Sequence, residues 1–138
     1  MIEVHFQDKM RIQGLKSYLN SLVKGLKLRR TVVHIRYQKK EDGKIMGCMV
    51  PCEYGIHIID IYVPEDHRYP CKMPDDYVKT FESLHHWRKY PRIVNNVQEY
   101  IAYIFLHEVH HIMQWRAKVA AHKEDDASAW ANIKWLPY

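Results

Sequence analysis

The chain has 138 residues, of which 47% are apolar, and its 21 basic and 16 acidic side chains leave a net charge of +5. This apolar content is too high for a disordered chain, and the length suits one compact domain over 1–138 that buries roughly two-thirds of its unfolded surface. No run approaches the roughly 20 consecutive apolar residues that cross a bilayer, so no membrane span is predicted.

The N-terminal segment and the cysteines predict a cytoplasmic protein. The opening sequence MIEVHFQDKMRIQG lacks the basic and apolar regions of a secretory signal. Three cysteines are an odd number and too few for a disulfide framework. The basic residues are spread along the chain, so a nucleic-acid partner is compatible with the charge but not required by it.

The first predicted element is an amphipathic helix that begins near Asp8, within a segment of helical period over 2–28. Its apolar residues recur at the three- and four-residue spacings of one helical face. They are Ile12, Leu15, Leu19, Leu22, Val23 and Leu26.

Three strands are predicted next. Residues 31–38 alternate and are rich in β-branched side chains. The Asp42-Gly43 pair is typical of a hairpin turn, which returns the chain as a second strand over 44–50. Residues 54–63 alternate again and predict the third strand.

Two helices are predicted in the second half of the chain, after a long connection. Residues 64–92 contain four of the six prolines, which predicts a surface connection with one short helix over 77–87. Residues 93–121 contain neither Pro nor Gly and keep the helical period, so they predict a long, largely buried helix. Residues 124–131 (EDDASAWA) predict a short helix with acids in its first turn, where they favour the helix dipole.

The long predicted helix carries the pattern H-E-x-x-H at His107-Glu108-Val109-His110-His111. His107 and His111 are four residues apart, so both imidazoles face one side of a helix, where each can lie about 2.0–2.1 Å from one Zn²⁺ ion. Glu108 can reach a water at that ion and act as general base. Because the motif lies among apolar residues, where unpaired polar groups are costly, we predict a zinc site rather than a chance match. His110 points about 80–100° away from its neighbours and is not predicted as a ligand.

A catalytic zinc site normally has three protein ligands, and residues 124–131 offer the third. They place Glu124, two alanines and a serine at spacings of three, four and seven, and therefore on one helical face. The pattern resembles the second motif of the gluzincin metallopeptidases, E-x-x-A-(D/N)-x-x-A. It is most similar to the ImmA/IrrE type, E-x-E-A-N-x-F-A, whose following L-x-P looks like Leu136-Pro137. This resemblance covers roughly the last third of the chain and implies Glu124 as the third ligand.

Asp126 is the alternative third ligand. Only 12 residues separate His111 from Glu124, fewer than is usual in gluzincins, and a shorter connection can rotate the second helix. An aspartate is chemically equivalent as a zinc ligand. Ser128 also stands where the family has Asp or Asn. If the acids only cap the helix, two histidines alone would hold the zinc, and weakly.

The resemblance implies an α+β, minimal zincin-like domain with an N-terminal helix, a small antiparallel sheet, the HExxH helix and a short acid-bearing C-terminal helix. It implies a zinc metallopeptidase that hydrolyses peptide bonds in a protein or peptide substrate, with a zinc-activated water and Glu108 as general base. By analogy with zincins, the strand over 54–63 would hold an extended substrate at the sheet edge.

Two other functions stay open. One is a SprT-like peptidase that works near DNA, which the net basic charge permits. The other is a non-catalytic, zinc-stabilised interaction module, in which Glu108 only pairs with a basic neighbour. The sequence specifies no oligomeric state.

Two further groups of residues are weaker candidates. Cys48, Cys52, Cys71 and His67 have loose spacing for a second, structural zinc site, and their strand context favours packed thiols. The second group is His85, His86, Trp87 and Tyr90, which can flank the cleft and offer a Tyr or His donor to an oxyanion, although surface aromatics are the simpler interpretation.

Overall fold

The computed structural model describes residues 2–7, 10–26, 28–42, 46–50, 56–65, 68–72 and 93–116. The chain forms two compact units, Met1–His67 and Arg68–Tyr138, and each is described by itself. Among the helices in these described ranges, none is both long enough and apolar enough to cross a membrane.

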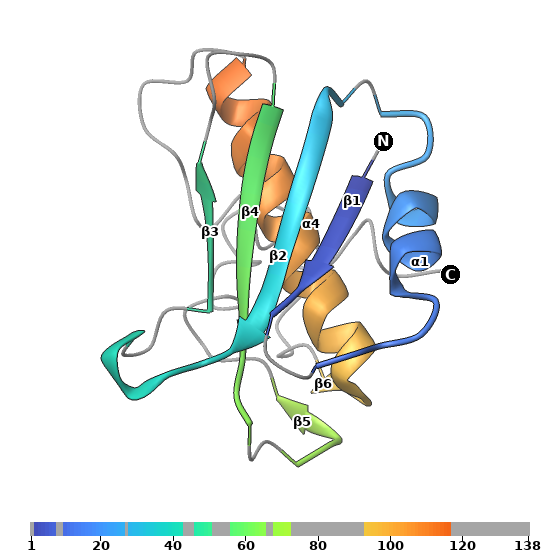
Figure 1. The fold of residues 1–138 in the computed structure, drawn as a ribbon. Coiled ribbons are helices and arrows are strands. Elements are labelled where there is room, and N and C mark those ends of the chain that lie inside the picture. The colour runs from blue at the N-terminus through green and yellow to red at the C-terminus, as the bar shows by residue number, and fades with distance from the viewer. Residues whose placement is uncertain are drawn as a thin grey trace, which may run out of the picture. The chain divides into compact units, whose positions relative to one another are not determined.

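The first unit is built on a four-stranded sheet with one helix (Figure 1). Its elements are β1 (Ile2–Phe6), α1 (Leu15–Leu22), β2 (Arg30–Tyr37), the 3-10 helix η1 (Lys40–Asp42), β3 (Gly47–Val50) and β4 (Ile56–Val63). The strand order is β1-β2-β4-β3, in which β1, β2 and β4 are parallel and β3 is antiparallel to β4. The α+β class is confirmed, but the sheet is mixed and the expected antiparallel sheet is wrong, because α1 carries the chain back so that β2 enters parallel to β1.

The N-terminal segment differs from its predicted helix. Residues 2–6 alternate apolar and polar side chains with a period of two, and they form an edge strand. The helix α1 begins at Leu15 rather than near Asp8, directly after Gly14, whose φ of 76° lies in the left-handed region that glycine adopts most easily. A second left-handed glycine, Gly25 with φ 90°, follows the helix. The predicted helix residues before Leu15 and after Leu22 therefore lie outside the helix.

The hairpin predicted between 31–38 and 44–50 is also wrong, because β4 lies between β2 and β3. The β2–β4 pair covers eight residues and sets Val33 beside Ile59, both fully buried. The β3–β4 pair covers only four residues. The longer pairing matches two alternating apolar strands over their whole length, so it buries more apolar surface than the local hairpin would.

The sheet has one buried face and one half-exposed face. On β4, and on β2 from Thr31 to Arg36, buried side chains alternate with half-buried ones. The buried apolar side chains of the first unit are Ile2, Met10, Leu15, Leu19, Val23, Val33, Ile35, Met46, Ile59, Ile61 and Val63. The helix α1 contributes two of them and packs beside β1. We call the half-exposed side of the sheet the outer face.

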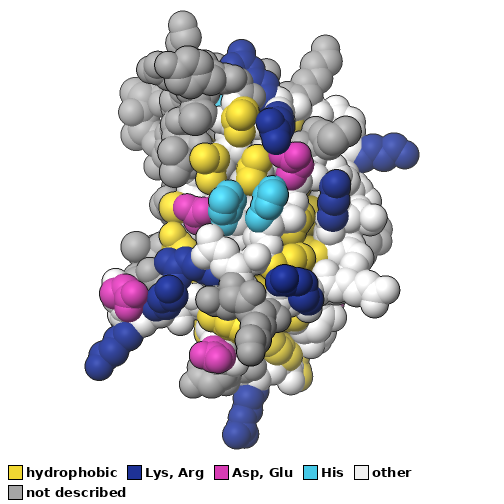
Figure 2. Space-filling model, in the orientation of Figure 1, with side chains coloured by type: hydrophobic (Ala, Val, Ile, Leu, Met, Phe, Trp, Pro, Cys, Tyr) yellow, Lys and Arg dark blue, Asp and Glu magenta, His cyan; other side chains and the backbone are white. Residues whose placement is uncertain are grey.

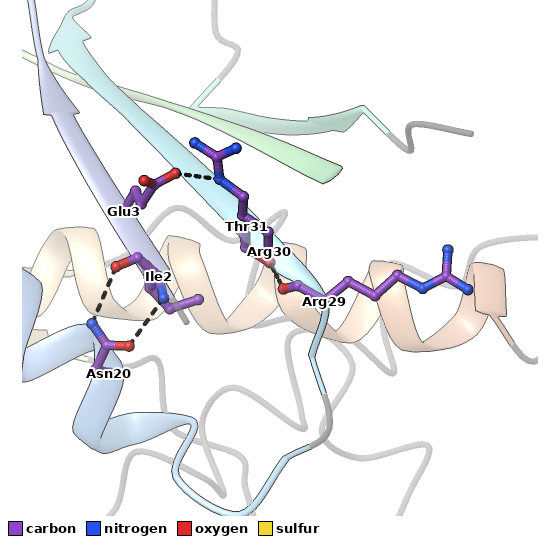
Figure 3. A network of polar contacts seen from close by, with 6 residues as sticks. All are labelled: Ile2, Glu3, Asn20, Arg29, Arg30 and Thr31. Carbon is purple, nitrogen blue, oxygen red and sulfur yellow. Dashed lines mark hydrogen bonds and ion pairs between the residues drawn. The ribbon is translucent and has the colours of Figure 1, made fainter. Parts of the chain in front are cut away.

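Asn20 ties helix α1 to the edge strand β1 (Figure 3). Its Oδ1 accepts a hydrogen bond from the backbone N–H of Ile2 at 3.0 Å, and its Nδ2 donates to the carbonyl of Ile2 at 3.3 Å. Nδ2 also donates to the carbonyl of Lys16 at 2.8 Å. β1 is an edge strand, and the Asn20 amide supplies the backbone N–H and carbonyl of Ile2 with the hydrogen bonds that a neighbouring strand would otherwise provide. The exposed Arg30 Nε–Glu3 Oε2 pair at 2.8 Å joins β1 to β2 beside it, and such pairs contribute little.

We expect Asn20→Ala to lower the free energy of unfolding by about 1–3 kcal/mol, since two hydrogen bonds to the backbone of Ile2 are lost. Urea unfolding followed by circular dichroism measures the change. Ser21→Ala is the matched control, because Ser21 is exposed and bonds only within the helix, to the carbonyl of Tyr18. It should change stability by less than about 0.5 kcal/mol. Equal unfolding midpoints for the two variants would contradict the role of Asn20.

The second unit contains the antiparallel pair β5 (Cys71–Lys72) and β6 (Ile93–Val94) and the helix α4 (Val97–Arg116). The predicted long helix is confirmed over these 20 residues, although its first predicted residues form β6. Asn96 caps the helix, with its Oδ1 accepting a hydrogen bond from the backbone N–H of Glu99 at 2.9 Å. Glu99 Oε1 accepts in turn from the backbone N–H of Asn95 at 3.0 Å. The predicted helices over 77–87 and 124–131 lie outside the described residues.

Candidate metal centre

The helix α4 presents the HExxH residues from a buried stretch. His107, Glu108 and His111 are only 1%, 4% and 4% exposed. The preceding residues 100–106 are buried apolar side chains without exception, and Val109 and Ile112 are buried as well. Polar and charged side chains are seldom this deeply buried, so these three residues are exceptional within the buried part of the helix.

His107 and His111 meet as the four-residue spacing predicts. Their Nε2 atoms are 3.1 Å apart, and their ring centroids are 4.8 Å apart with the ring planes inclined by 77°. Two nitrogens that each lie 2.0–2.1 Å from one tetrahedral zinc are about 3.3 Å apart. The imidazoles therefore already have nearly the separation that a shared ion requires. The same distance also lets one neutral ring donate a hydrogen bond to the other.

Glu108 occupies the next position on the helix, about 100° around the axis from His107. A carboxylate in so little contact with water carries a large desolvation cost, which a nearby positive charge offsets. His110 is half-buried, and helical geometry turns it away from the His107–His111 pair. The described part of the motif therefore provides two nitrogen donors and one neighbouring carboxylate.

Glu124 and Asp126, the two residues predicted as the third ligand, lie outside the described residues. His85, His86, Trp87 and Tyr90 also lie outside them. Within the described ranges, no three or more His, Cys, Asp or Glu side chains are gathered as a metal site would require. Of the predicted site, the structure therefore describes His107, Glu108 and His111.

The two described cysteines of the second candidate zinc site fall in different units. Cys48 lies in β3 of the first unit, where its Sγ donates a hydrogen bond to Asp60 Oδ2 at 3.6 Å. Cys71 lies in β5 of the second unit, and burial raises the pKa of its thiol. Both are present as thiols. Cys52 and His67 lie outside the described residues.

The strand expected to hold substrate is not at an edge of the sheet. β4 occupies most of the segment predicted over 54–63, and it pairs with β2 on one side and with β3 on the other. β4 is therefore an internal strand, paired with β2 over all eight residues and with β3 over Ile58–Ile61, and it offers no continuous free edge to an added strand. The edge strands are β1 and β3.

One group of polar residues was missed by sequence reasoning, namely His5, His34 and Asp60 on the outer face of the sheet. The alternation of side chains along each strand could have shown that these residues face solvent, because each lies on the half-exposed side of its strand. Their alignment with one another depends on strand order, which the sequence pattern did not predict.

Comparison with protein-family models, with curated proteins and with solved structures found no match for this chain. The resemblance to gluzincins accordingly rests on the motif residues themselves.

Proposed function

We propose that this protein is a zinc-dependent metallopeptidase of minimal zincin-like fold that hydrolyses peptide bonds in a protein substrate. The observation that supports it best is the buried His107–His111 pair, whose Nε2 atoms are 3.1 Å apart beside Glu108. Two imidazoles and a carboxylate are costly to bury as ordinary core residues, whereas imidazole nitrogens are preferred ligands of zinc. Nitrogen donors at this separation fit the ion.

In the proposed mechanism, His107 and His111 hold the ion and Glu124 or Asp126 completes the ligand set. Zinc, when bound, makes a water molecule more acidic and polarises a carbonyl. Glu108 takes the proton of the attacking water and passes it to the nitrogen of the leaving amine, so it serves first as base and then as acid. These side chains have little exposure to solvent, and the low dielectric constant around them strengthens the electrostatic interactions that they make.

The proposed partner is a protein or peptide substrate, and the proposed compartment is the cytoplasm. The odd, small number of cysteines and the two thiols in the described ranges support that compartment. The net charge of +5 allows a nucleic-acid partner without requiring one. Salt-dependent binding to DNA would favour the SprT-like alternative.

The zinc content of the purified chain tests the proposal. After dialysis against metal-free buffer, we expect about one tightly held zinc per chain, as three protein ligands predict. Glu124→Ala should lose the zinc if Glu124 is the third ligand, and Asp126→Ala should lose it if Asp126 is. Asp125→Ala is the matched control, because it removes the acid between them.

A wild-type chain without tightly held zinc would contradict the proposal. Zinc retained in both Glu124→Ala and Asp126→Ala would contradict both third-ligand assignments. Zinc held without any hydrolysis of peptides would favour the non-catalytic interaction module.

A further inference from the structure

Four metal-ligating residue types stand in one row across the outer face of the sheet. Strand register places His5 of β1 opposite His34 of β2, His34 opposite Asp60 of β4, and Asp60 opposite Cys48 of β3. Residues paired in this way project from the same face of the sheet. The row therefore joins segments that are as much as 55 residues apart in the sequence, from position 5 to position 60.

The row is accessible to an ion from solvent. His5 is exposed, and His34, Asp60 and Cys48 are half-buried. Figure 2 looks onto this face, where two histidine side chains lie next to each other and an acidic side chain lies close by. The residues directly before and after His34 on β2, and directly before and after Asp60 on β4, point to the buried face instead.

The two imidazoles of the row are already neighbours. The ring centroids of His5 and His34 are 5.7 Å apart and their planes are inclined by 33°, whereas the converged His107–His111 rings are 4.8 Å apart. Rotation of the two side chains about their χ angles can turn one nitrogen of each ring toward a shared ion. Exposed side chains change rotamer within picoseconds to nanoseconds, so this movement meets no packing barrier at His5.

Asp60 is placed to add an oxygen donor. It is the direct neighbour of His34 on the side away from His5, about 4.8 Å across one strand spacing. Cys48 Sγ donates to Asp60 Oδ2 at 3.6 Å, and a ligand carboxylate is commonly oriented by such an outer hydrogen bond. Cys48 itself is three strand spacings from His5, roughly 14 Å, so one ion cannot join both ends of the row.

Two cationic side chains on the outer face of β2 have other contacts. Arg30 pairs with Glu3, and the guanidinium of Arg36 lies 4.2 Å from the centre of the Tyr62 ring. Neither arrangement directs its positive charge to the histidine pair. The donors available at the row are then two imidazoles and one carboxylate, a set that suits Zn²⁺, Ni²⁺ or Cu²⁺ and disfavours Mg²⁺ and Ca²⁺.

We propose that the outer face of the sheet binds one divalent transition-metal ion through His5 and His34, with Asp60 as the third donor. The three donors are not gathered around one point in the described conformation, so the ion draws the histidines together as it binds. This site is separate from the HExxH motif and does not rest on the proposed peptidase activity. Its ligands come from three strands of the first unit.

Isothermal titration of the full-length chain with ZnCl₂ tests the proposal. We expect the wild type to bind a second zinc more weakly than the one that survives dialysis. His5→Ala and His34→Ala should each weaken this second step about tenfold or more, and Asp60→Asn should weaken it less, because His34 and His5 still provide two nitrogens. Titration with MgCl₂ should give no binding.

Glu3→Gln is the matched control, because Glu3 lies on the same strand and the same face as His5 and pairs with Arg30. It should bind the second zinc as the wild type does. For the wild type alone, zinc should shift the imidazole resonances of His5 and His34 in nuclear magnetic resonance spectra, so the test does not depend on the folding of any variant.

The proposal is overturned if His5→Ala and His34→Ala bind zinc as tightly as the wild type, or if neither imidazole resonance moves. The first zinc depends on His107 and His111, and the second depends on His5, His34 and Asp60. The loss of one binding step therefore contradicts one proposal and leaves the other intact.

Discussion

Glu108→Gln should lower the rate of peptide hydrolysis by about 10²–10⁴-fold, the range that a positioned general base contributes. The substitution keeps the size and shape of a side chain that is only 4% exposed, so the helix and the histidine pair should be undisturbed. It removes the carboxylate that accepts the proton from the attacking water. The fall should appear in kcat rather than in KM, because the interaction is made in the transition state.

The measurement uses a library of quenched fluorescent peptides, with zinc content and circular dichroism recorded on the same samples. Glu99→Gln is a matched control, because Glu99 lies in the first turn of the same helix and bonds to the backbone of Asn95. It should hydrolyse peptides at the wild-type rate. Full activity in Glu108→Gln would rule out the general-base role, and loss of zinc from it would mean that Glu108 is instead a ligand.

His111→Ala should weaken zinc binding by more than about 100-fold, because even partners outside the ligand shell cost 10- to 100-fold. The substitution removes one of the two nitrogens that now stand 3.1 Å apart, and His107 cannot replace it from its own position on the helix. Peptide hydrolysis should be lost together with the zinc. Competition with a fluorescent zinc chelator measures the affinity.

His110→Ala provides the comparison, since it removes an imidazole from the adjacent, half-buried position that faces away from the pair. It should keep both the zinc and the activity. An equal loss of zinc in the two variants would show that the pair is not the specific binding element. Circular dichroism should show α4 intact in both, because alanine favours a helix.

The histidine pair was predictable from the sequence because its geometry is local. A helix carries residues four apart onto one side whatever else the chain does, so the spacing of His107 and His111 alone indicated that their rings would meet. The helix itself followed from a stretch without Pro or Gly that keeps the helical period. No distant segment had to be known.

The sheet was only partly predictable, because strand pairing is non-local. The alternation over 31–38 and 54–63 indicated two strands, and both exist as β2 and β4. The Asp42-Gly43 signal favoured a hairpin, yet β2 pairs instead with β4 over eight residues. A local turn preference is small beside the apolar surface that the longer pairing buries, and only the whole set of strands shows which partners compete.

The sequence by itself therefore determined the mixture of helices and strands, the long helix and the HExxH pair, which follow from patterns within single segments. Only the tertiary structure decided that β4 is internal and that His5, His34 and Asp60 share one row. Strand order depends on which distant segments bury the most apolar surface against each other. The pattern of a single segment does not show which of the other strands it will pair with.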